Sequence, residues 1–306
     1  MSIEHELAAF IPLRPTLLTV GVFDSVHLGH QTLLRRLIDE SASRGLTPGV
    51  VTFNCHPLSL LSPQKAPLGL AGPEENVRRI KALGIDLVIS LTFDAAMAAT
   101  DARAFALLLK HHLRMKGLVL GWDFAMGHHR SGTLTALADL GRQLDFTTEV
   151  VPAVTLSGET ISSTAIRQAL AEGNMTKARA MLGHPFCLEG IVVRGAGRGT
   201  GLGYPTANLE IDPGLIVPAE GVYATETYLD DRPYPSVTAV TRCPTFGATK
   251  RTIEIHILDF SGDIYGQRLR LDIIEYLRPA RRFDGTGALS EQLARDTLRA
   301  REILSA

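Results

Sequence analysis

The sequence has little cysteine, few aromatic residues, almost no net charge and no long apolar run. Its three cysteines, Cys55, Cys187 and Cys243, lie far apart in 306 residues, which is typical of reduced thiols in a cytoplasmic protein. The formal net charge is −1, so the chain lacks the basic surface of a general nucleic-acid-binding protein. No apolar run reaches the length of a membrane span, and residues 1–15 lack the apolar region of a secretory signal. We therefore expect a cytoplasmic protein that binds neither nucleic acid nor membrane.

The first part of the chain has the pattern of an α/β fold. Hydrophobic residues make up 45% and charged residues 21% of the sequence, and 306 residues are enough for two packed domains. Short apolar runs of strand character alternate with segments whose apolar residues recur at helical spacing. The predicted strands are 17–23, 49–53, 85–93, 118–124 and 146–154, and the predicted helices are 30–45, 73–84, 101–117 and 133–145. This alternation indicates a doubly wound parallel sheet that helices cover on both faces.

The pattern changes from Phe186 onward, where strands separated by glycine and proline turns predominate. The predicted strands are 187–193, 221–229, 235–241, 251–260 and 267–277, followed by a terminal helix over 288–304. Strands at this spacing favour an antiparallel β-barrel. We therefore predict two domains, residues 1–183 and residues 184–306.

One candidate site is the stretch GVFDSVHLGH, residues 21–30, which joins a predicted strand to a predicted helix. A helix N-terminus presents unpaired backbone N–H groups and a positive dipole, and both attract phosphate. Gly29 would let a phosphate approach the backbone closely. His27 and His30 lie on one helix face and could both donate hydrogen bonds to phosphate oxygens. By spacing alone, a pair of capping or surface histidines is an equally good interpretation.

A second stretch, ISSTAIRQAL, residues 161–170, also opens a helix after a strand. Ser162, Ser163 and Thr164 can cap that helix or bind phosphate, and Arg167 can pair with a polyphosphate. Together, the two stretches resemble the nucleotidyltransferase superfamily of adenylyl- and cytidylyltransferases. That resemblance implies that His27, His30 and Arg167 hold a nucleoside triphosphate while a nucleophilic phosphate displaces pyrophosphate. It also implies an ATP site that includes Gly21, Phe23, Asp24, Gly29, Ser162, Ser163 and Thr164.

The second part of the chain carries its own candidate phosphate site in GRGTGLGYPTANLEI, residues 197–211. A glycine-rich turn can wrap phosphates with its N–H groups, although such a turn alone is more often an ordinary β-turn. The oxygen ligands of Thr206 and Asn208 suit a Mg²⁺ ion that already carries nucleotide phosphates. The candidate ATP-binding residues here are Gly197, Arg198, Gly199, Thr200 and Pro205.

The sequence PTAN, residues 205–208, and the strand KRTIEIHILDFSGDIYGQ, residues 250–267, resemble the riboflavin kinase family. The resemblance implies that Glu254 is the general base that takes the proton from the flavin 5′-hydroxyl. It also implies that Arg278 and Phe283, in the segment LRPARRFDG, contact the flavin. In the first domain, GWDFAMGHHRSG resembles the G-x-D-F-x-F-G outline of the FAD synthetases, with Met126 in place of the second phenylalanine. The resemblance makes Asp123 and Phe124 candidate flavin contacts.

The nucleotidyltransferase motifs precede the riboflavin kinase motifs along the chain, as expected for a bifunctional enzyme. The whole sequence resembles the bacterial bifunctional riboflavin kinase/FAD synthetase family. The resemblance implies that the second domain converts riboflavin and ATP to FMN and ADP. The first domain would then convert FMN and ATP to FAD and pyrophosphate, with Mg²⁺ offsetting phosphate charge in both. The expected partners are riboflavin, FMN and ATP, and we expect a monomer or a weak homo-oligomer.

The first domain departs from the family pattern at several positions. Val22 and Ser25 replace the usual asparagine and glycine, and Asn54 and Cys55 replace glutamate and proline. Three alternatives therefore stay open: a riboflavin kinase with a weak or inactive first domain, a first domain that acts on another acceptor, and a flavin sensor without turnover. Trp122, beside Asp123, would either stack on an aromatic ligand or pack in the core.

Overall fold

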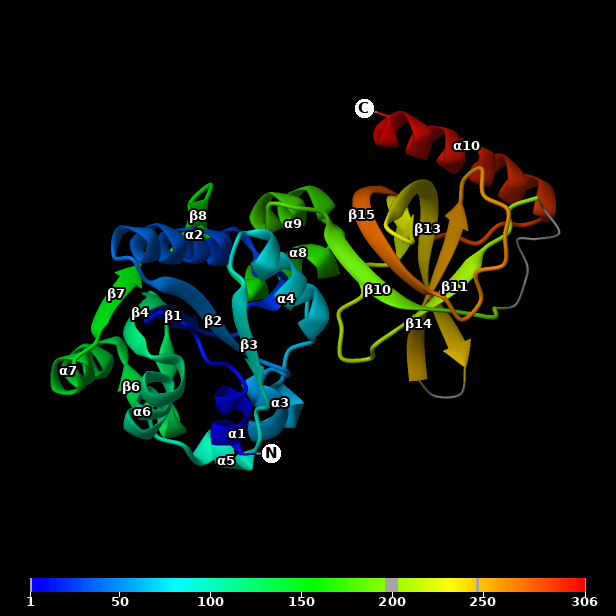
Figure 1. Ribbon diagram of the computed structural model, residues 1–306. Helices are drawn as coiled ribbons and strands as arrows, with labels where there is room; N and C mark the ends of the chain where they lie inside the picture. The colour runs from blue at the N-terminus through cyan, green and yellow to red at the C-terminus, as the bar shows by residue number, and fades with distance from the viewer. Residues whose placement is uncertain (1, 196–202, 246–247, 306) are drawn as a thin grey trace. The chain divides into compact units, whose positions relative to one another are not determined.

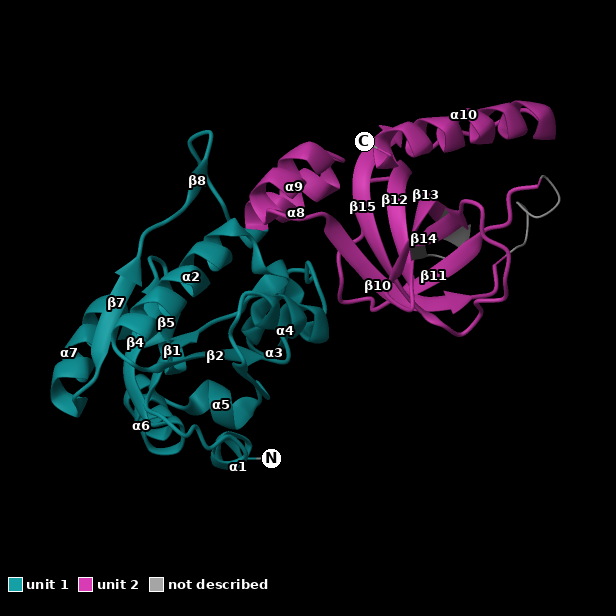
Figure 2. Cartoon of the chain, turned by 45° about the horizontal axis from the view of Figure 1, so that its top comes forward, with its two compact units in different colours: residues 1–163 teal, residues 164–306 magenta. Residues whose placement is uncertain are grey.

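The computed structural model describes residues 2–195, 203–245 and 248–305. The chain divides into two compact units, residues 1–163 and residues 164–306 (Figure 2). Unit 1 contains an open parallel sheet with helices, and unit 2 contains a barrel with three helices (Figure 1). The predicted fold class, a doubly wound α/β domain followed by an antiparallel barrel with a terminal helix, is confirmed.

The sheet of unit 1 has five parallel strands in the order β3-β2-β1-β4-β7. They are β1 (Thr16–Val20), β2 (Thr47–Phe53), β3 (Leu87–Leu91), β4 (Met115–Gly121) and β7 (Thr147–Val151). From β1, the chain adds β2 and β3 on one side and then β4 and β7 on the other. The crossover point therefore lies between β1 and β4, and their carboxyl ends open onto the same edge of the sheet.

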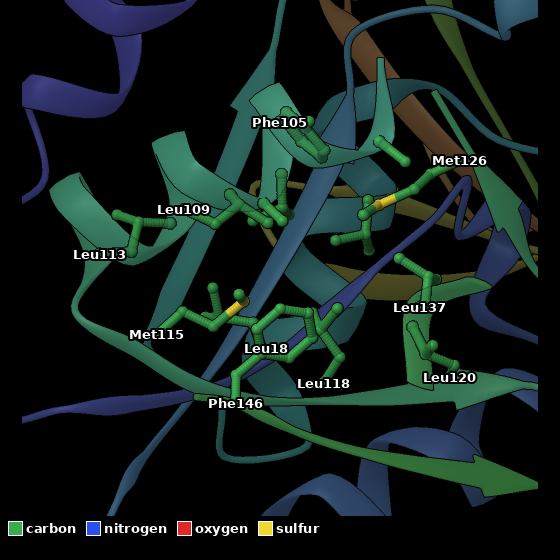
Figure 3. Packing of buried hydrophobic residues seen from close by; sticks show 14 of the residues in the cluster. Leu18, Phe105, Leu109, Leu113, Met115, Leu118, Leu120, Met126, Leu137 and Phe146 are labelled. Atoms are coloured by element: carbon green, nitrogen blue, oxygen red, sulfur yellow. The ribbon is translucent and has the colours of Figure 1, made fainter. Parts of the chain in front are cut away.

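Helices bury both faces of this sheet, as the continuous apolar strands predicted. On one face, α2 (Leu28–Ser43) and α4 (Pro73–Ala82) pack over a cluster that includes Leu17 and Val119. On the other, α1 (Ile3–Ala8), α6 (Ala102–Leu113) and α7 (Leu134–Leu144) pack over a cluster that includes Leu18 and Leu118 (Figure 3). Neighbouring residues of a strand point to opposite faces, so Leu17 and Leu18 belong to different clusters.

Shorter elements of unit 1 connect these layers. The 3₁₀ turn η1 (Asp24–Val26) precedes α2, and α3 (Pro57–Leu61), η2 (Pro63–Lys65) and α5 (Ala95–Ala99) lie in the connections around β3. The hairpin of β5 (Ala125–Met126) and β6 (Gly132–Thr133) encloses η3 (His128–Arg130). The hairpin of β8 (Thr155–Leu156) and β9 (Glu159–Thr160) comes directly before ISST.

Unit 2 forms a closed antiparallel barrel in the order β10-β11-β14-β13-β12-β15. Its strands are β10 (Phe186–Val193), β11 (Ala207–Ile211), β12 (Gly221–Leu229), β13 (Arg232–Thr245), β14 (Ala248–Ile257) and β15 (Arg268–Arg278). Sequence reasoning missed β11, because its five residues follow a glycine-rich stretch of sequence and give a short pattern. The terminal helix α10 (Thr286–Leu304) begins two residues before the predicted start at 288.

Three helices pack on the barrel. The helix α8 (Ser163–Ala171) is tied to it by a hydrogen bond of 2.9 Å from the Ala219 N–H to the Leu170 carbonyl. The helix α9 (Met175–Leu182) packs against β10 and β15. On the outer surface, α10 covers β12 and β13, where Ala300 is buried against Val222 and Val237.

Candidate functional site

The first site is built on the loop that joins β1 to α2. The N–H of Gly21 bonds to the Val51 carbonyl at 3.0 Å, which continues the parallel pairing beyond the end of β1. His27 is the N-cap of α2, and its Nδ1 accepts a hydrogen bond of 3.3 Å from the His30 N–H. A neutral His27 that accepts at Nδ1 carries its proton at Nε2. The cap places the His27 ring at the N-terminus of α2, next to the crossover point.

The two histidines form one stacked unit. Their ring centroids are 3.7 Å apart with an interplanar angle of 16°, and the Phe23 ring meets the His30 ring edge-on at 5.2 Å. His30 Nδ1 is buried and has no hydrogen-bond partner among the described residues. Burial, and secondly the neighbouring His27, hold the pKa of His30 well below its ordinary value. His30 is therefore neutral at pH 7, with a buried nitrogen that an incoming ligand can satisfy.

Gly29 lies close to the start of the second predicted stretch, at Ile161. A Cβ atom at this position would lie 3.1 and 3.2 Å from His27 ring atoms and 3.6 Å from the carbonyl oxygen of Ile161. Ile161 is the first residue of ISST, so this motif lies beside the glycine between the two histidines. Ser163 begins α8, and Arg167 follows one turn later, half-buried. A side chain at position 29 would therefore crowd the His27 ring, whereas close approach of a phosphate to this glycine stays a prediction.

Asp24 supports the histidine loop from within the protein. Its buried Oδ1 accepts hydrogen bonds from the Leu70 N–H at 2.8 Å and the Ala71 N–H at 3.2 Å. Phe23, also buried, belongs to the core cluster under α2 and α4. Both residues were predicted to bind ATP, and that role stays a prediction.

Sequence reasoning missed Asn76, which fixes the strained turn of this loop. Asn76 Oδ1 accepts the Ser25 N–H at 2.7 Å. Ser25 and Val26 have φ angles of 60° and 46°, in the left-handed region where glycine is easily accommodated and β-branched residues are rare. An asparagine in the first turns of a helix carries no distinctive signal, so only the fold shows this contact.

The predicted flavin contacts of unit 1 follow β4. Asp123 is exposed, and its carbonyl accepts a hydrogen bond of 3.3 Å from Arg130. Phe124 is half-buried and packs against the cluster under α6 and α7. Trp122 is 52% exposed, which excludes the core-packing alternative. Asn54 is one of the departures from the family pattern. Its Oδ1 accepts a hydrogen bond of 3.2 Å from the Phe93 N–H and so ties the end of β2 to the segment after β3.

The second site lies on the outer surface of the barrel, where β11 and β14 pair. Glu254 is directly opposite Asn208 on β11 and opposite Ala239 on β13. Ile253 and Ile255 are buried, whereas Glu254 is half-buried. The predicted alternation, with Glu254 and His256 on one face and isoleucines on the other, is therefore confirmed. The strand pairing brings the candidate base and a candidate metal ligand to adjacent positions.

The segment that contains Pro205 and Thr206 is anchored beside Glu254. His256 Nδ1 and the Pro205 carbonyl are 2.8 Å apart, and the Tyr204 ring meets the His256 ring edge-on at 5.3 Å. The Asn208 amide lies so close to Gly195 that a Cβ atom there would be 1.8 Å from Asn208 Nδ2. Within the described part of the chain, the Glu254 carboxylate has no hydrogen bond or ion pair, so its oxygens are available to accept a proton. Gly197, Arg198, Gly199 and Thr200 lie outside the described residues.

The predicted flavin contacts of unit 2 lie where β15 meets α10. Arg278 Nη2 is 2.7 Å from Asp296 Oδ2, and Nε is 3.0 Å from Oδ1. Its guanidinium carbon lies 5.7 Å from the centroid of the Phe283 ring. Asp296 is buried and also accepts a hydrogen bond of 2.8 Å from Gln292. Arg278 thus holds α10 and the Phe283 segment together, a role that the sequence alone did not indicate.

Comparison with known proteins divides the chain into two enzymatic parts. A family model described as FAD synthetase matches residues 12–165, and a model described as riboflavin kinase matches residues 182–304. The chain is 38% identical to the bifunctional riboflavin kinase/FMN adenylyltransferase of Escherichia coli K12, over 95% of this chain and 93% of that one. It is 32% identical to the Bacillus subtilis protein of the same name, over 92% and 90%.

A solved structure extends the similarity to the whole fold. It is described as a macrolide-efflux protein from Streptococcus pneumoniae, and it superposes with a TM-score of 0.87 at 31% identity. The superposition covers 96% of each chain. In the described residues of the present chain, no helix combines the length and the apolar character needed to cross a membrane.

Proposed function

The chain belongs to the bifunctional riboflavin kinase/FMN adenylyltransferase family, and we propose how its two sites divide that chemistry. It carries both enzymatic domains and makes FMN and FAD from riboflavin and ATP. We assign phosphorylation of riboflavin to the barrel, and adenylylation of FMN to the parallel sheet. We place the boundary between the two catalytic domains at residues 183/184. The riboflavin kinase family model, which starts at residue 182, and the start of β10 at Phe186 support this boundary.

The observation that carries the kinase assignment is the register that sets Glu254 directly opposite Asn208. In the proposed step, Glu254 accepts the proton of the riboflavin 5′-hydroxyl, and that oxygen forms a bond to the γ-phosphorus of ATP. The bond from the γ-phosphorus to the β,γ-bridging oxygen breaks, and ADP leaves. The half-buried carboxylate, which has no ion-pair partner in the described chain, suits a proton acceptor.

We propose that Thr206 and Asn208 hold Mg²⁺ together with the phosphates of ATP. A hydroxyl and an amide oxygen are hard, neutral donors, and they suit an ion that brings most of its ligands with it. No cluster of three or more acidic, histidine or cysteine residues forms a metal site in the described chain, consistent with a metal that arrives with the nucleotide. The ion would offset the negative charge of the phosphates.

In the proposed adenylyl transfer, a phosphate oxygen of FMN forms a bond to the α-phosphorus of ATP. The bond from the α-phosphorus to the α,β-bridging oxygen breaks, and pyrophosphate leaves with that oxygen. His27 and His30 donate hydrogen bonds to the triphosphate at the N-terminus of α2, where the backbone N–H groups and the helix dipole add to them. Gly21, Gly29, Ser162, Ser163, Thr164 and Arg167 are proposed to complete the ATP site. Asp24 and Phe23 would act through the loop that they hold.

Two single variants separate the activities in the intact protein. Purified protein is incubated with ATP, Mg²⁺ and either riboflavin or FMN, and the flavins are separated at timed intervals. Glu254→Gln should abolish FMN formation and leave FAD formation from supplied FMN unchanged. His30→Ala should abolish FAD formation and leave the kinase intact. Equal loss of both activities in either variant would refute the two-site assignment.

The same experiment tests the remaining alternatives. Accumulation of FMN without FAD in the wild-type protein would favour a riboflavin kinase whose first domain is inactive or uses another acceptor. Absence of both products would favour a flavin sensor. The cytoplasmic location rests on the three dispersed cysteines, and we propose a monomer or a weak homo-oligomer.

A further inference from the structure

The only tryptophan of the chain, Trp122, stands at the end of a buried strand and is left exposed. Residues 117–120 of β4 are buried, and Trp122 follows that strand with 52% of its surface exposed. In the described part of the chain, the indole takes part in no hydrogen bond, aromatic pair or cation–π contact. An indole left in water forgoes the burial of a large apolar surface, so this position has a structural cost that the fold does not offset.

The exposed indole occupies the edge of the sheet where nucleotides bind in open α/β folds. β4 is paired directly with β1, and the chain order reverses between these two strands. The carboxyl end of β1 leads into the histidine loop, and the carboxyl end of β4 leads into Trp122. Ligands of such sheets lie in the crevice outside the strand ends at this point. The indole and the phosphate-binding histidines therefore lie at the same edge.

The backbone on both sides of Trp122 is held in place. The Phe124 N–H bonds to the Gly121 carbonyl at 3.1 Å and closes a turn around Trp122 and Asp123. Phe124 packs into the core, and Arg130 bonds to the Asp123 carbonyl. With the backbone fixed, stacking of a flat ligand on the ring orders only the side chain of Trp122, which costs little conformational entropy.

We propose that Trp122 is a stacking surface for the heteroaromatic ring of a nucleotide bound at the adenylyl-transfer site. This inference rests on the proposed function of unit 1, where two such rings meet: the adenine of ATP and the isoalloxazine of FMN. Both are flat heteroaromatic rings with an exposed π-face, and both stack on indole through the same chemistry. Trp122 would set the affinity and specificity for the ring, while the histidines bind the phosphates.

The first test measures ring stacking by equilibrium binding. Because Trp122 is the only tryptophan, the indole emission of the wild-type protein reports on this position alone. ATP should quench that emission saturably, whereas inorganic tripolyphosphate, which lacks a ring, should bind without quenching. Stacking of FMN is read from quenching of the flavin's own fluorescence. If neither ATP nor FMN produces saturable quenching, the proposal is overturned.

The second test uses variants and separates the two rings. Trp122→Ala should raise the KM of the stacked substrate in FAD formation by about 5- to 100-fold, with a much smaller change in kcat. Trp122→Phe, which retains an aromatic face, should stay within about threefold of the wild type. A rise in the KM of ATP identifies adenine, and a rise in the KM of FMN identifies isoalloxazine. Unchanged KM values for both substrates in Trp122→Ala would refute stacking.

These outcomes are distinct from a failure of the proposed function. If the wild-type protein forms no FAD from FMN and ATP, the adenylyl-transfer assignment fails, but quenching of the indole by ATP still reports whether a base stacks there. If the wild type forms FAD and Trp122→Ala is indistinguishable from it, only the stacking proposal fails. Riboflavin kinase activity, which belongs to unit 2, serves as the control for folding and should be unchanged in both variants.

Discussion

Replacing Asp296 by alanine should loosen α10 from the barrel and inactivate the kinase at a lower temperature. Asp296 is 4% exposed and accepts hydrogen bonds from Arg278 Nη2 at 2.7 Å, Arg278 Nε at 3.0 Å and Gln292 Nε2 at 2.8 Å. Removing one partner of a buried ion pair leaves the other charge without compensation, which costs about 3–5 kcal/mol. Since the Arg278 side chain keeps 17% of its exposure, water partly compensates its charge, and we expect a cost shifted below this range, to about 2–4 kcal/mol.

In a unit of this size, that loss corresponds to a fall in Tm of roughly 10 °C. The assay heats the intact protein to a series of temperatures and then measures both activities on cooling. In Asp296→Ala, the midpoint for loss of riboflavin phosphorylation should fall, and the midpoint for FAD formation from FMN should stay constant. Selective loss of the kinase distinguishes an effect on unit 2 from general unfolding.

A matched control lies on the same helix. Glu291 and Arg295 form an exposed i,i+4 pair at 3.3 Å, with side chains 73% and 68% exposed. Such a pair contributes less than about 0.5 kcal/mol, so Glu291→Ala should leave both midpoints within about 2 °C of the wild type. If Asp296→Ala behaves like Glu291→Ala, the buried pair does not hold α10 and the reasoning is refuted.

Three further predictions concern the histidine loop. Because the pKa of His30 is lowered in the folded protein, the unfolded chain binds more protons below pH 6.5. The contribution of His30 to the free energy of unfolding is therefore complete above that pH and falls below it, by at most about 1.4 kcal/mol per pH unit. In circular dichroism melts between pH 7.5 and 5.5, the Tm of His30→Asn should depend less steeply on pH than that of the wild type. Asn76→Ala should destabilise the protein by about 1–3 kcal/mol, because the Ser25 N–H loses its acceptor, and it should slow FAD formation without affecting the kinase. Asn76→Asp keeps the acceptor and should restore both stability and FAD formation, and failure to restore them would contradict this reasoning. Gly29→Ala should lower the rate of FAD formation at least tenfold, because its Cβ would displace the His27 ring. Its Tm should be unchanged or slightly higher, since alanine favours the helix. A wild-type rate of FAD formation in this variant would mean that the close packing of position 29 against His27 is unimportant.

Local patterns predicted the elements that carry the chemistry. The apolar runs predicted the five strands of the parallel sheet, because a strand buried on both faces must be continuously apolar. Alternation in residues 252–257 predicted the outward face of Glu254, because strand side chains alternate. In contrast, β11 was missed, because a five-residue strand after a glycine-rich stretch of sequence has too short a pattern to be distinguished from a loop.

The sequence by itself determined the fold class, the order of the two enzymatic parts and the motifs of both sites, because periodicity and capping act over a few neighbouring residues. Only the tertiary structure decided how those motifs are held. The contacts of Asp24 with residues 70–71, of Asn76 with Ser25 and of Arg278 with Asp296 join positions 18 to 51 residues apart. No local pattern encodes such pairs. Their partners are chosen by how the layers pack, and that same packing leaves Trp122 exposed at the edge of the sheet where a nucleotide would bind.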